Sequence, residues 1–492
     1  MIDNYSPSTE KYSENYQIDK PEEACGVFGI YAPEEDVAKL TYFGLYALQH
    51  RGQESAGIAT FQGEKIYTHK GMGLVSQVFN ESTLQQLPGN TGIGHTRYST
   101  TGSSRIINAQ PTVVDTPLGP LALAHNGNLV NTVELREELI KSGCYFNSTT
   151  DSEMIALAIA TEVKTGKSWL EAAISAFHLC QGAFSLTIAT SEGLMGVRDP
   201  QGIRPLVIGT LEKINPKRYV LASETCALDI IGAEYLRDVE PGELVWITEK
   251  GMASFHWSQK PQRKLCIFEM IYFARPDSRM EGGSLYSYRL RIGRQLARES
   301  FIDADMVIGI PDSGIPAAIG FSQESGIPYA EGLIKNRYVG RTFIQPTQHM
   351  RESGIRMKLN PLKDVLEGKR VIMVDDSIVR GNTSKKIVKA LRDTGAKEVH
   401  MRISSPPVTH PCFYGIDTDN QEQLIGATKS VAEIAEQIGV ESLAYLSWEG
   451  MLKSTEEDPN SFCSACFTGN YPVPLPEKLK RSKLMLENPI QV

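Results

Sequence analysis

Long apolar runs are missing from this sequence. No stretch reaches the roughly 18 consecutive apolar residues that a membrane-spanning helix requires. The first residues also lack the basic and apolar regions of a secretory signal peptide. We therefore expect a cytoplasmic protein that has no membrane partner.

A net positive charge is missing too. The 492 residues carry a net charge of −8, which argues against a broad nucleic-acid-binding surface, although a local basic pocket for phosphates is compatible with it. With 41% hydrophobic and 22% charged residues, the composition is that of a globular protein of two or three domains. The expected partners are small molecules.

Cysteine is sparse. The eight cysteines are too few for a disulfide scaffold, so in a reducing compartment we expect them to be buried, catalytic or metal-binding. Cys144, Cys180 and Cys226 show no recognisable spacing and are interpreted as packing residues. The other five lie in or near motifs that carry chemistry.

The stretch from Lys369 to Ser384 has the pattern of a loop that binds a sugar phosphate. The β-branched run Val371–Val374 predicts a buried parallel strand, and Lys385–Leu391 predicts a helix after the loop. Two carboxylates at the strand end, Asp375 and Asp376, suit the two hydroxyls of a ribose. For this acid pair alone, an ordinary strand–loop–helix with exposed acids is the alternative.

The loop after the two acids provides hydroxyls and backbone N–H groups at a helix N-terminus, where a phosphate is favoured. Its small and polar residues are Ser377, Gly381, Asn382 and Thr383. The run V-D-D-S-I-V-R-G-N-T resembles the phosphoribosyl-pyrophosphate (PRPP) loop of the type I phosphoribosyltransferases, in the version carried by the amidophosphoribosyltransferases. The resemblance implies that the acids, these loop residues and Arg380 bind PRPP.

A second strand–loop–helix signal precedes that loop in the chain. The run D-M-V-I-G-I-P predicts a strand that leads into D-S-G-I-P, after a helix expected over Ser287–Glu299. An ordinary buried strand ending in a turn is the alternative. The resemblance implies that this loop faces pyrophosphate, with Ser313 joining Asp375 and Asp376 at a Mg²⁺ ion, which prefers hard oxygen ligands.

A basic, glycine-containing stretch separates the two loops. Such a stretch is usually a solvated surface. Beside two phosphate loops it resembles the mobile flap that closes over PRPP and excludes water. The candidates for phosphate contacts are Lys335, Arg337, Arg341 and Arg356.

Cys25 opens an alternating, glycine-punctuated strand, where most lone cysteines would be structural. Four polar clusters follow it, each at the end of an apolar segment: Leu45–Ala59, Gly94–Gly102, Ala124–Leu129 and Thr149–Glu153. The ordered series resembles the N-terminal-nucleophile glutaminase domain of class II amidotransferases. In that family the nucleophilic cysteine is the first residue of the mature chain. The resemblance therefore implies that Met1–Ala24, a polar stretch without helical or strand period, is a removable propeptide.

The same resemblance assigns the residues of glutamine hydrolysis. Cys25 is the nucleophile, and Asn126 with the N–H of Gly127 stabilises the oxyanion. Arg97 and Asp151 match the positions that bind the carboxylate and the ammonium of glutamine.

The base for Cys25 is expected to be its own α-amino group. A free α-amine has a pKa of about 7.7–8.0, so it is suited to accept a proton near neutral pH. The histidines His95 and His125 could instead orient strand ends or form a Cys–His pair.

Four cysteines remain: Cys266, Cys412, Cys463 and Cys466. Four thiolates could hold a tetrahedral zinc ion, and a single C-x-x-C could be structural zinc or a redox pair. The resemblance is to the cluster-bearing branch of the amidophosphoribosyltransferases, where cysteines at these positions hold a [4Fe–4S] cluster. Because these residues are distant in sequence, the metal is expected to staple the C-terminal segment to the transferase domain.

The two series together predict an N-terminal-nucleophile αββα sandwich followed by a type I phosphoribosyltransferase domain with a parallel sheet. The expected limits are a leader at 1–24, a glutaminase domain at 25–257, a transferase domain at 265–450 and a C-terminal segment at 451–492. The implied reaction is glutamine-dependent amidation of PRPP to 5-phosphoribosylamine, the first committed step of purine synthesis. An apolar passage for ammonia, inhibition by purine nucleotides and a homotetramer are implied as well.

Two rival classes of function are weighed against this reading. A regulatory PRPP-binding protein would keep the second-half loops without needing the N-terminal thiol and oxyanion residues. Another glutamine-dependent synthase would keep the first half but would lack D-D-S-I-V-R-G-N-T. The presence of both motif series on one chain favours neither rival.

Overall fold

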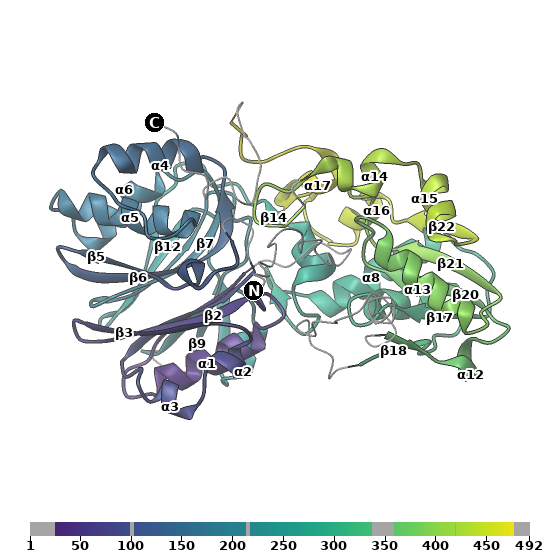
Figure 1. Ribbon diagram of the computed structural model, residues 1–492, viewed down its shortest axis with the longest axis horizontal. Coiled ribbons are helices and arrows are strands. Elements are labelled where there is room, and N and C mark those ends of the chain that lie inside the picture. Colours follow the sequence, from purple (N-terminus) through teal and green to yellow (C-terminus); the bar gives the residue numbers. More distant parts are fainter. Residues whose placement is uncertain (1–24, 99–102, 213–216, 337–358, 419, 477–492) are drawn as a thin grey trace, which may run out of the picture.

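The computed structural model describes residues 25–98, 103–212, 217–336, 359–418 and 420–476. The predicted leader lies outside these residues. The chain forms two units that lie side by side in Figure 1, one before and one after the short strand β14 (Leu265–Cys266).

Two antiparallel sheets are stacked in the first unit. The strand order of the larger sheet is β11 (Glu234–Asp238), β9 (Val207–Thr210), β10 (Tyr219–Ala222), β1 (Gly26–Tyr31), β4 (Thr91–Arg97), β2 (Ser55–Gln62) and β3 (Lys65–Met72). The strand order of the smaller sheet is β13 (Gly251–His256), β12 (Glu243–Thr248), β8 (Gly193–Arg198), β7 (Gly182–Thr190), β6 (Gly119–Leu129) and β5 (Thr112–Thr116). Apolar side chains of both sheets, such as Val27 and Ala122, form one core between them.

Helices cover the outer faces of these two sheets. On the larger sheet they are α1 (Val37–Ala47), α2 (Val75–Val78), α3 (Glu81–Leu84) and α7 (Cys226–Asp229). On the smaller sheet they are α4 (Thr132–Lys141), α5 (Asp151–Lys164) and α6 (Trp169–Phe177). The resulting order of helix, sheet, sheet, helix confirms the predicted αββα sandwich.

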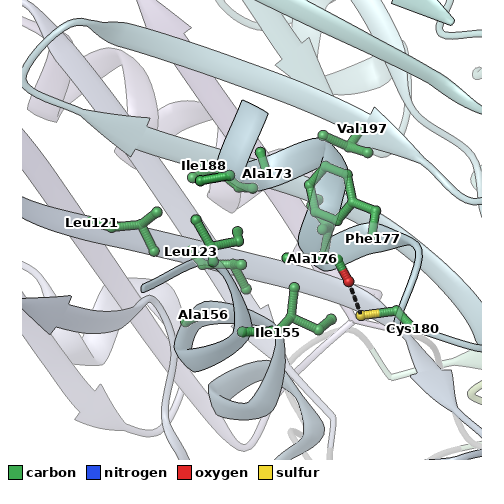
Figure 2. Packing of buried hydrophobic residues seen from close by; sticks show 14 of the residues in the cluster. Leu121, Leu123, Ile155, Ala156, Ala173, Ala176, Phe177, Cys180, Ile188 and Val197 are labelled. Carbon is green, nitrogen blue, oxygen red and sulfur yellow. Dashed lines mark hydrogen bonds between the residues drawn. The ribbon is translucent and has the colours of Figure 1, made fainter. Parts of the chain in front are cut away.

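Figure 2 shows the core between α5, α6 and the smaller sheet, with Phe177 pointing into it. Cys180 lies beside this core, and its thiol donates a hydrogen bond of 3.4 Å to the carbonyl of Ala176. Cys144 belongs to the same core, and Cys226, the first residue of α7, is buried in the core between the larger sheet and its helices. The interpretation of these three cysteines as packing residues is confirmed.

A parallel sheet forms the centre of the second unit. Its strand order is β17 (Met306–Gly309), β20 (Arg370–Asp375), β21 (Glu398–Ile403) and β22 (Ser442–Tyr445). Side chains of β20 alternate between two cores, with Ile372 facing α8 (Leu285–Glu299) and α9 (Ile315–Ser325). Val371 faces the opposite core, with α13 (Asn382–Asp393) and α15 (Val431–Ile438). Helices therefore cover both faces, which explains why β20 reads as a continuous apolar run.

A two-residue parallel strand pairing holds the C-terminal segment against the start of the second unit. Strand β23 (Phe462–Cys463) pairs with β14 and sets Cys463 opposite Cys266. An apolar cluster of residues from both units surrounds this pairing, and it includes Val130 and Ala183 of the first unit. The junction is therefore a packed core of its own.

Shorter elements connect these layers: β15 (Arg279–Met280), β16 (Gly283–Ser284), β18 (Leu333–Lys335), β19 (Leu359–Pro361), α12 (Lys363–Leu366), α14 (Ile425–Thr428), α16 (Trp448–Lys453), α17 (Ala465–Thr468), the 3₁₀ turns η1 (Ile106–Asn108), η3 (Gln421–Gln423) and η4 (Pro459–Ser461), and the π-helical turn η2 (Glu269–Phe273). Within the described ranges, no helix is both long and apolar enough to cross a membrane. The expected domain limits remain predictions.

Two candidate active sites and a four-cysteine centre

Cys25 lies at the wall of a small cavity in the first unit. It directly precedes β1, at the centre of the larger sheet. The cavity holds about 260 Å³ of space including open solvent, and its lining is Cys25, Arg97, Tyr98, Gln110, His125, Gly127, Thr150, Asp151 and Ser152. Four of the five residues predicted for glutamine hydrolysis therefore share one cavity, although their positions in the chain span more than one hundred residues.

The Cys25 thiol is held by the backbone of Tyr98. Its Sγ donates to the Tyr98 carbonyl at 3.2 Å and accepts from the Tyr98 N–H at 3.5 Å. Burial raises the pKa of this thiol to about 12, and Arg97 opposes that shift only in part. At pH 7 the thiolate is therefore present in on the order of one molecule in 10⁵, so nucleophilic attack needs a base at the thiol.

Arg97 and Asp151 reach this cavity from two different elements. Arg97 stands at the end of a strand, and Asp151 stands at the start of a helix. Arg97 ends β4 and donates from Nη1 to the Ser103 carbonyl at 3.1 Å. Asp151 begins α5, whose N-cap Thr150 accepts from the Glu153 N–H. Burial favours the neutral acid, but the interactions with His125 and the hydrogen bonds from the Leu129 and Ser152 N–H groups together outweigh it and hold the pKa of Asp151 below its ordinary value. Asp151 is therefore a carboxylate at neutral pH.

Asn126 and Gly127 differ in their relation to the cavity. Gly127 lines it, whereas Asn126, the preceding residue of β6, does not. Both amide atoms of Asn126 are buried and have no hydrogen-bond partner among the described residues. A buried amide without partners costs free energy, so Asn126 has the character of a group kept for a ligand. Gly127 has φ +147°, and a Cβ there would lie 2.0 Å from the Ala183 carbonyl oxygen.

The two histidines of this region do not hydrogen-bond to Cys25. His95 Nε2 lies 3.0 Å from the His125 carbonyl, and burial lowers the pKa of His95 to about 3. His125 Nδ1 lies 3.2 Å from Ser152 Oγ and 3.6 Å from Asp151 Oδ1. His125 thus orients Asp151, and the Cys–His alternative finds no support in these contacts.

In the second unit, the predicted sugar-phosphate loop connects β20 to α13. Asp375 and Asp376 are 2% and 0% exposed, so the alternative of an ordinary loop with exposed acids is wrong. Ser377 Oγ donates to Asp376 Oδ1 at 2.6 Å, and Gly381 caps α13 with φ +83°. The predicted helix begins earlier than expected, at Asn382, which brings the loop's last residues into its first turn.

The second loop meets this one through a side-chain contact. Ser313, just before α9, donates from Oγ to Asp376 Oδ2. Lys335, at the end of β18, forms an ion pair with Asp312 of the same loop. The remaining basic candidates, Arg337, Arg341 and Arg356, lie outside the described residues.

Arg289 was missed by the sequence reasoning. This arginine of α8 is 2% exposed, and it donates to the carbonyls of Met270 and Ala274 at 2.9 and 2.6 Å. Burial lowers the pKa of Arg289 to about 10, and the charge of Asp376 opposes that change. The one sequence signal for Arg289 was its position on the face of α8 where the apolar residues recur with helical spacing. That pattern predicts an apolar residue and says nothing about a cation beneath the carboxylates.

All four cysteines assigned to a metal lie in the apolar cluster at the junction. Cys266 and Cys463 face each other across β14 and β23, and Cys466, three residues after Cys463, lies in α17. Tyr414 donates its N–H to Cys412 Sγ at 3.3 Å. Burial raises the pKa of Cys266 to about 11 and also raises those of Cys463 and Cys466, so ionisation of these thiols at neutral pH requires a compensating cation.

Known families match both units. A model described as a glutamine amidotransferase domain matches residues 95–229, and one described as a phosphoribosyl transferase domain matches residues 288–404. An amidophosphoribosyltransferase of a Synechocystis species is 73% identical over 474 residues, covering 96% of each chain. The Bacillus subtilis amidophosphoribosyltransferase is 50% identical over 456 residues, covering 92% of this chain and 94% of its own.

A solved structure agrees with these relatives. The Bacillus subtilis glutamine PRPP amidotransferase complexed with ADP and GMP superimposes with a TM-score of 0.87, at 48% identity over 93% of this chain and 99% of its own. The similarity extends across both units and the junction. The chain carries the Cys25 cavity in one unit and the Asp375–Asp376 loop in the other, and it is similar to these enzymes over nearly its whole length. It therefore belongs to the amidophosphoribosyltransferase family.

Proposed function

We propose that this enzyme transfers the amide nitrogen of glutamine to PRPP, giving 5-phosphoribosylamine, glutamate and pyrophosphate, the first committed step of purine synthesis. The observation that carries the proposal is the presence on one chain of the Cys25 cavity and the Asp375–Asp376 loop. Relatives named amidophosphoribosyltransferase support it over nearly the whole length.

Glutamine hydrolysis takes place at Cys25. Removal of Met1–Ala24 frees the α-amine of Cys25, which takes the thiol proton as Sγ attacks the amide carbon. The Gly127 N–H and the Asn126 side chain receive the oxyanion charge. Collapse of the intermediate releases ammonia, and water then frees glutamate from the thioester.

Recognition of glutamine uses the two ionised groups of the cavity. The Arg97 guanidinium pairs with the α-carboxylate, and the Asp151 carboxylate pairs with the α-ammonium. Since the Leu129 N–H donates to Asp151 Oδ2 at 3.0 Å, the carboxylate is fixed before substrate enters. An amide lacking either charged group would make only one of these two ion pairs, which accounts for selection of a free amino acid.

Ammonia then attacks C1 of PRPP as pyrophosphate leaves. Asp375 and Asp376 bind the two ribose hydroxyls, and the N-terminus of α13 binds the 5-phosphate through the loop residues Ser377 to Thr383 with Arg380. Lys335, with Arg337 and Arg341, neutralises the leaving pyrophosphate. The apolar cluster at the junction includes Ala183, which lies beside Gly127, and Val379 of the PRPP loop, and it is the proposed passage for neutral ammonia.

Magnesium is the expected cation at this second site. The residues that would hold it are Ser313, Asp375 and Asp376, whose oxygens gather at the loop and fit a hard cation. Such an ion supplies charge neutralisation on the pyrophosphate. Mg²⁺ sites in enzymes commonly use one or two protein carboxylates together with phosphate oxygens of the substrate.

The four junction cysteines are proposed to hold a [4Fe–4S] cluster, whose chemistry here is structural or oxygen-sensing. One zinc ion with Zn–S bonds of about 2.3 Å would need sulfurs about 3.8 Å apart. Among the described residues, no three Cys, His, Asp or Glu side chains are placed to hold a single metal ion. A cluster takes one cysteine on each iron, so four thiols match its ligand number, and zinc remains the alternative.

Nucleotide inhibition and assembly extend the proposal. The Bacillus subtilis relative carries ADP and GMP in its solved structure. Purine nucleotides present the same ribose 5-phosphate as PRPP, so they would compete at the Asp375–Asp376 loop. We also propose a homotetramer in solution.

One preparation tests the reaction. Anaerobically purified protein is assayed for intact mass and for pyrophosphate release from PRPP, with glutamine or with ammonium salt as the nitrogen donor. The expected mature chain begins at Cys25. In Cys25→Ala the glutamine-dependent rate falls by more than about 10³, while the ammonia-dependent rate remains.

Cys180→Ala is the matched control, because Cys180 is another buried thiol whose pKa burial raises to about 12 and which bonds only within the first core. It should keep both activities. An active enzyme that retains residues 1–24 would refute the α-amine as base, and absence of both activities in the wild type would refute the reaction itself.

A further inference from the structure

A row of buried ions runs from the Cys25 backbone toward the four cysteines. Arg51 donates from Nε to the Cys25 carbonyl at 3.1 Å and from Nη2 to Glu269 Oε1 at 2.7 Å. Arg204 donates from Nη1 to the same Glu269 oxygen at 2.9 Å. The side chains of all three ions are 0% exposed. Glu224 accepts from Arg51 at 2.6 Å and completes the charge balance on the Cys25 side.

The far end of this row lies among the cysteines. Arg204 donates from Nε to the Tyr414 carbonyl at 2.9 Å, and Tyr414 in turn donates its N–H to Cys412 Sγ. The Cys266 N–H donates to the carbonyl of Ile203, the residue before Arg204, at 3.0 Å. Glu269 follows Cys266 by three residues and begins η2.

One nitrogen of Arg204 is unused. Its Nη2 is buried and has no hydrogen-bond partner among the described residues. A buried cationic N–H without an acceptor is costly, and four thiolates around a metal centre carry the negative charge that would satisfy it. A metal centre bound by the four cysteines would therefore suit both the thiols and this unpaired N–H.

A second, independent contact joins the cysteines to the oxyanion strand. Asn128 donates from Nδ2 to the Phe413 carbonyl at 3.2 Å, one residue after Cys412. Gly415 has φ +102° and packs so closely that a Cβ there would lie 3.0 Å from the carbonyl carbon and oxygen of Gly127. Cys266 and Cys412 are therefore each linked, through a few residues, to a different part of the glutamine site.

We propose that Arg204 and Glu269 are positioning residues that couple the four-cysteine centre to the glutamine site: metal binding fixes Arg204, Arg204 fixes Glu269, and Glu269 holds Arg51 on the Cys25 carbonyl. The coupling rests on the proposed function for the role of Cys25. It acts on the glutamine half-reaction and leaves the PRPP half-reaction alone, because none of the three ions contacts the Asp375–Asp376 loop.

The test compares Arg204→Gln and Glu269→Gln with wild type, purified without oxygen as full-length chains. In both variants we expect the ratio of glutamine-dependent to ammonia-dependent pyrophosphate release to fall by about tenfold or more, a change typical of residues behind a metal ligand. For Arg204→Gln we also expect visible absorbance and iron content to decay several-fold faster in air. Arg204→Lys keeps the charge and should restore most of the air stability.

Arg198→Gln is the matched control. Arg198 is an equally buried arginine of the first unit, but it donates to the carbonyls of Val239 and Gly202 and lies outside the ion row. It should change neither the activity ratio nor the decay in air.

Two results would overturn the coupling. One is an unchanged activity ratio in Glu269→Gln, which keeps the shape of the carboxylate and decides the matter if Arg204→Gln does not accumulate as folded protein. The other is an equal fall in Arg198→Gln. A wild-type enzyme without glutamine-dependent release would instead refute the proposed function, so the two failures are distinguishable.

Discussion

The Cys25 thiol cannot ionise unaided at neutral pH, because burial raises its pKa to about 12. The proposed base, the α-amine of Cys25, would have to be neutral in order to accept this proton. We therefore expect glutamine-dependent kcat/KM to fall tenfold per pH unit below a midpoint near roughly 7.7, the ordinary α-amine pKa. The measurement is a pH profile of glutamate release between pH 5.5 and 9. A midpoint that moves in His125→Gln would assign the base to that histidine and contradict the expectation.

His95 makes a second prediction at this scale, about stability. Its folded pKa of about 3 lies below the unfolded value of about 6.5, so the unfolded chain binds a proton that the folded chain refuses. The stabilisation is complete above pH 6.5 and is lost as pH falls toward 3, by about 1.4 kcal/mol per pH unit. Urea unfolding of wild type and His95→Gln at pH 7.5 and 5.5 checks this. Equal pH sensitivity of the two proteins would show that His95 is not the titrating group.

Several site residues were predictable because each stands in a short run that resembles a glutaminase motif. Cys25, Arg97 and Asp151 stand in short polar runs at strand and helix ends, and the structure gathers them at one cavity. Arg51, Arg204 and Arg289 were not predictable as buried cations, because a lone arginine in a sequence reads as a surface group. Their partners come from distant segments, as with Arg204 and Tyr414.

At the scale of elements, two glycines of β6 differ in the space that a Cβ atom would have. Gly127→Ala would put a methyl group against the Ala183 carbonyl, whereas Gly119 has open space around a Cβ despite φ +105°. We expect Gly127→Ala to lower glutamine-dependent kcat by about 10²–10³, since the oxyanion N–H shifts, and to spare ammonia-dependent turnover. Gly119→Ala should cost about 1–3 kcal/mol of stability, because φ +105° is strained for alanine, with both activities intact. Parallel kinetics and thermal melts decide this, and equal kinetic loss in both variants would argue against an oxyanion role.

The loop between β20 and α13 supports a complementary prediction. Asp376→Asn removes a buried carboxylate that accepts from Ser313 and Ser377. Pyrophosphate release should fall by about 10² or more with either nitrogen donor, while glutamine hydrolysis to glutamate continues. Asp393→Asn, at the exposed far end of α13, is the control and should be neutral. Retained ammonia-dependent release in Asp376→Asn would remove this residue from the PRPP site.

Elements themselves were largely predictable, since period and turn chemistry specify them. The strand over Val371–Val374 and the helix over Lys385–Leu391 both exist, and the helix starts three residues earlier because Gly381, with positive φ, serves as its cap. The pairing of β14 with β23 could not be predicted. It is two residues long, and its register depends on tertiary packing at the junction.

At the scale of the whole molecule, the junction determines how the C-terminal segment is held. Cys463→Ser removes one member of the four-cysteine centre, and serine is a poor ligand for iron or zinc. We expect iron to be lost, the melting temperature to drop by several degrees, and trypsin to cleave after Lys453 sooner than in wild type. Cys144→Ser is the control and should retain iron, because Cys144 is a buried cysteine of the first unit that is hydrogen-bonded to Thr161. A variant with wild-type protease resistance would show that the apolar cluster alone holds the segment.

The pairing of Cys266 with Cys463 also sets an order of events during synthesis. A ribosome delivers the sheets of the first unit, then Cys266, and then every strand of the parallel sheet before Cys463 emerges. The four thiols can therefore meet only after both catalytic units have been translated. A chain that stalls within the second unit never assembles the centre, so incorporation of the proposed metal would mark molecules whose translation has passed the last catalytic element.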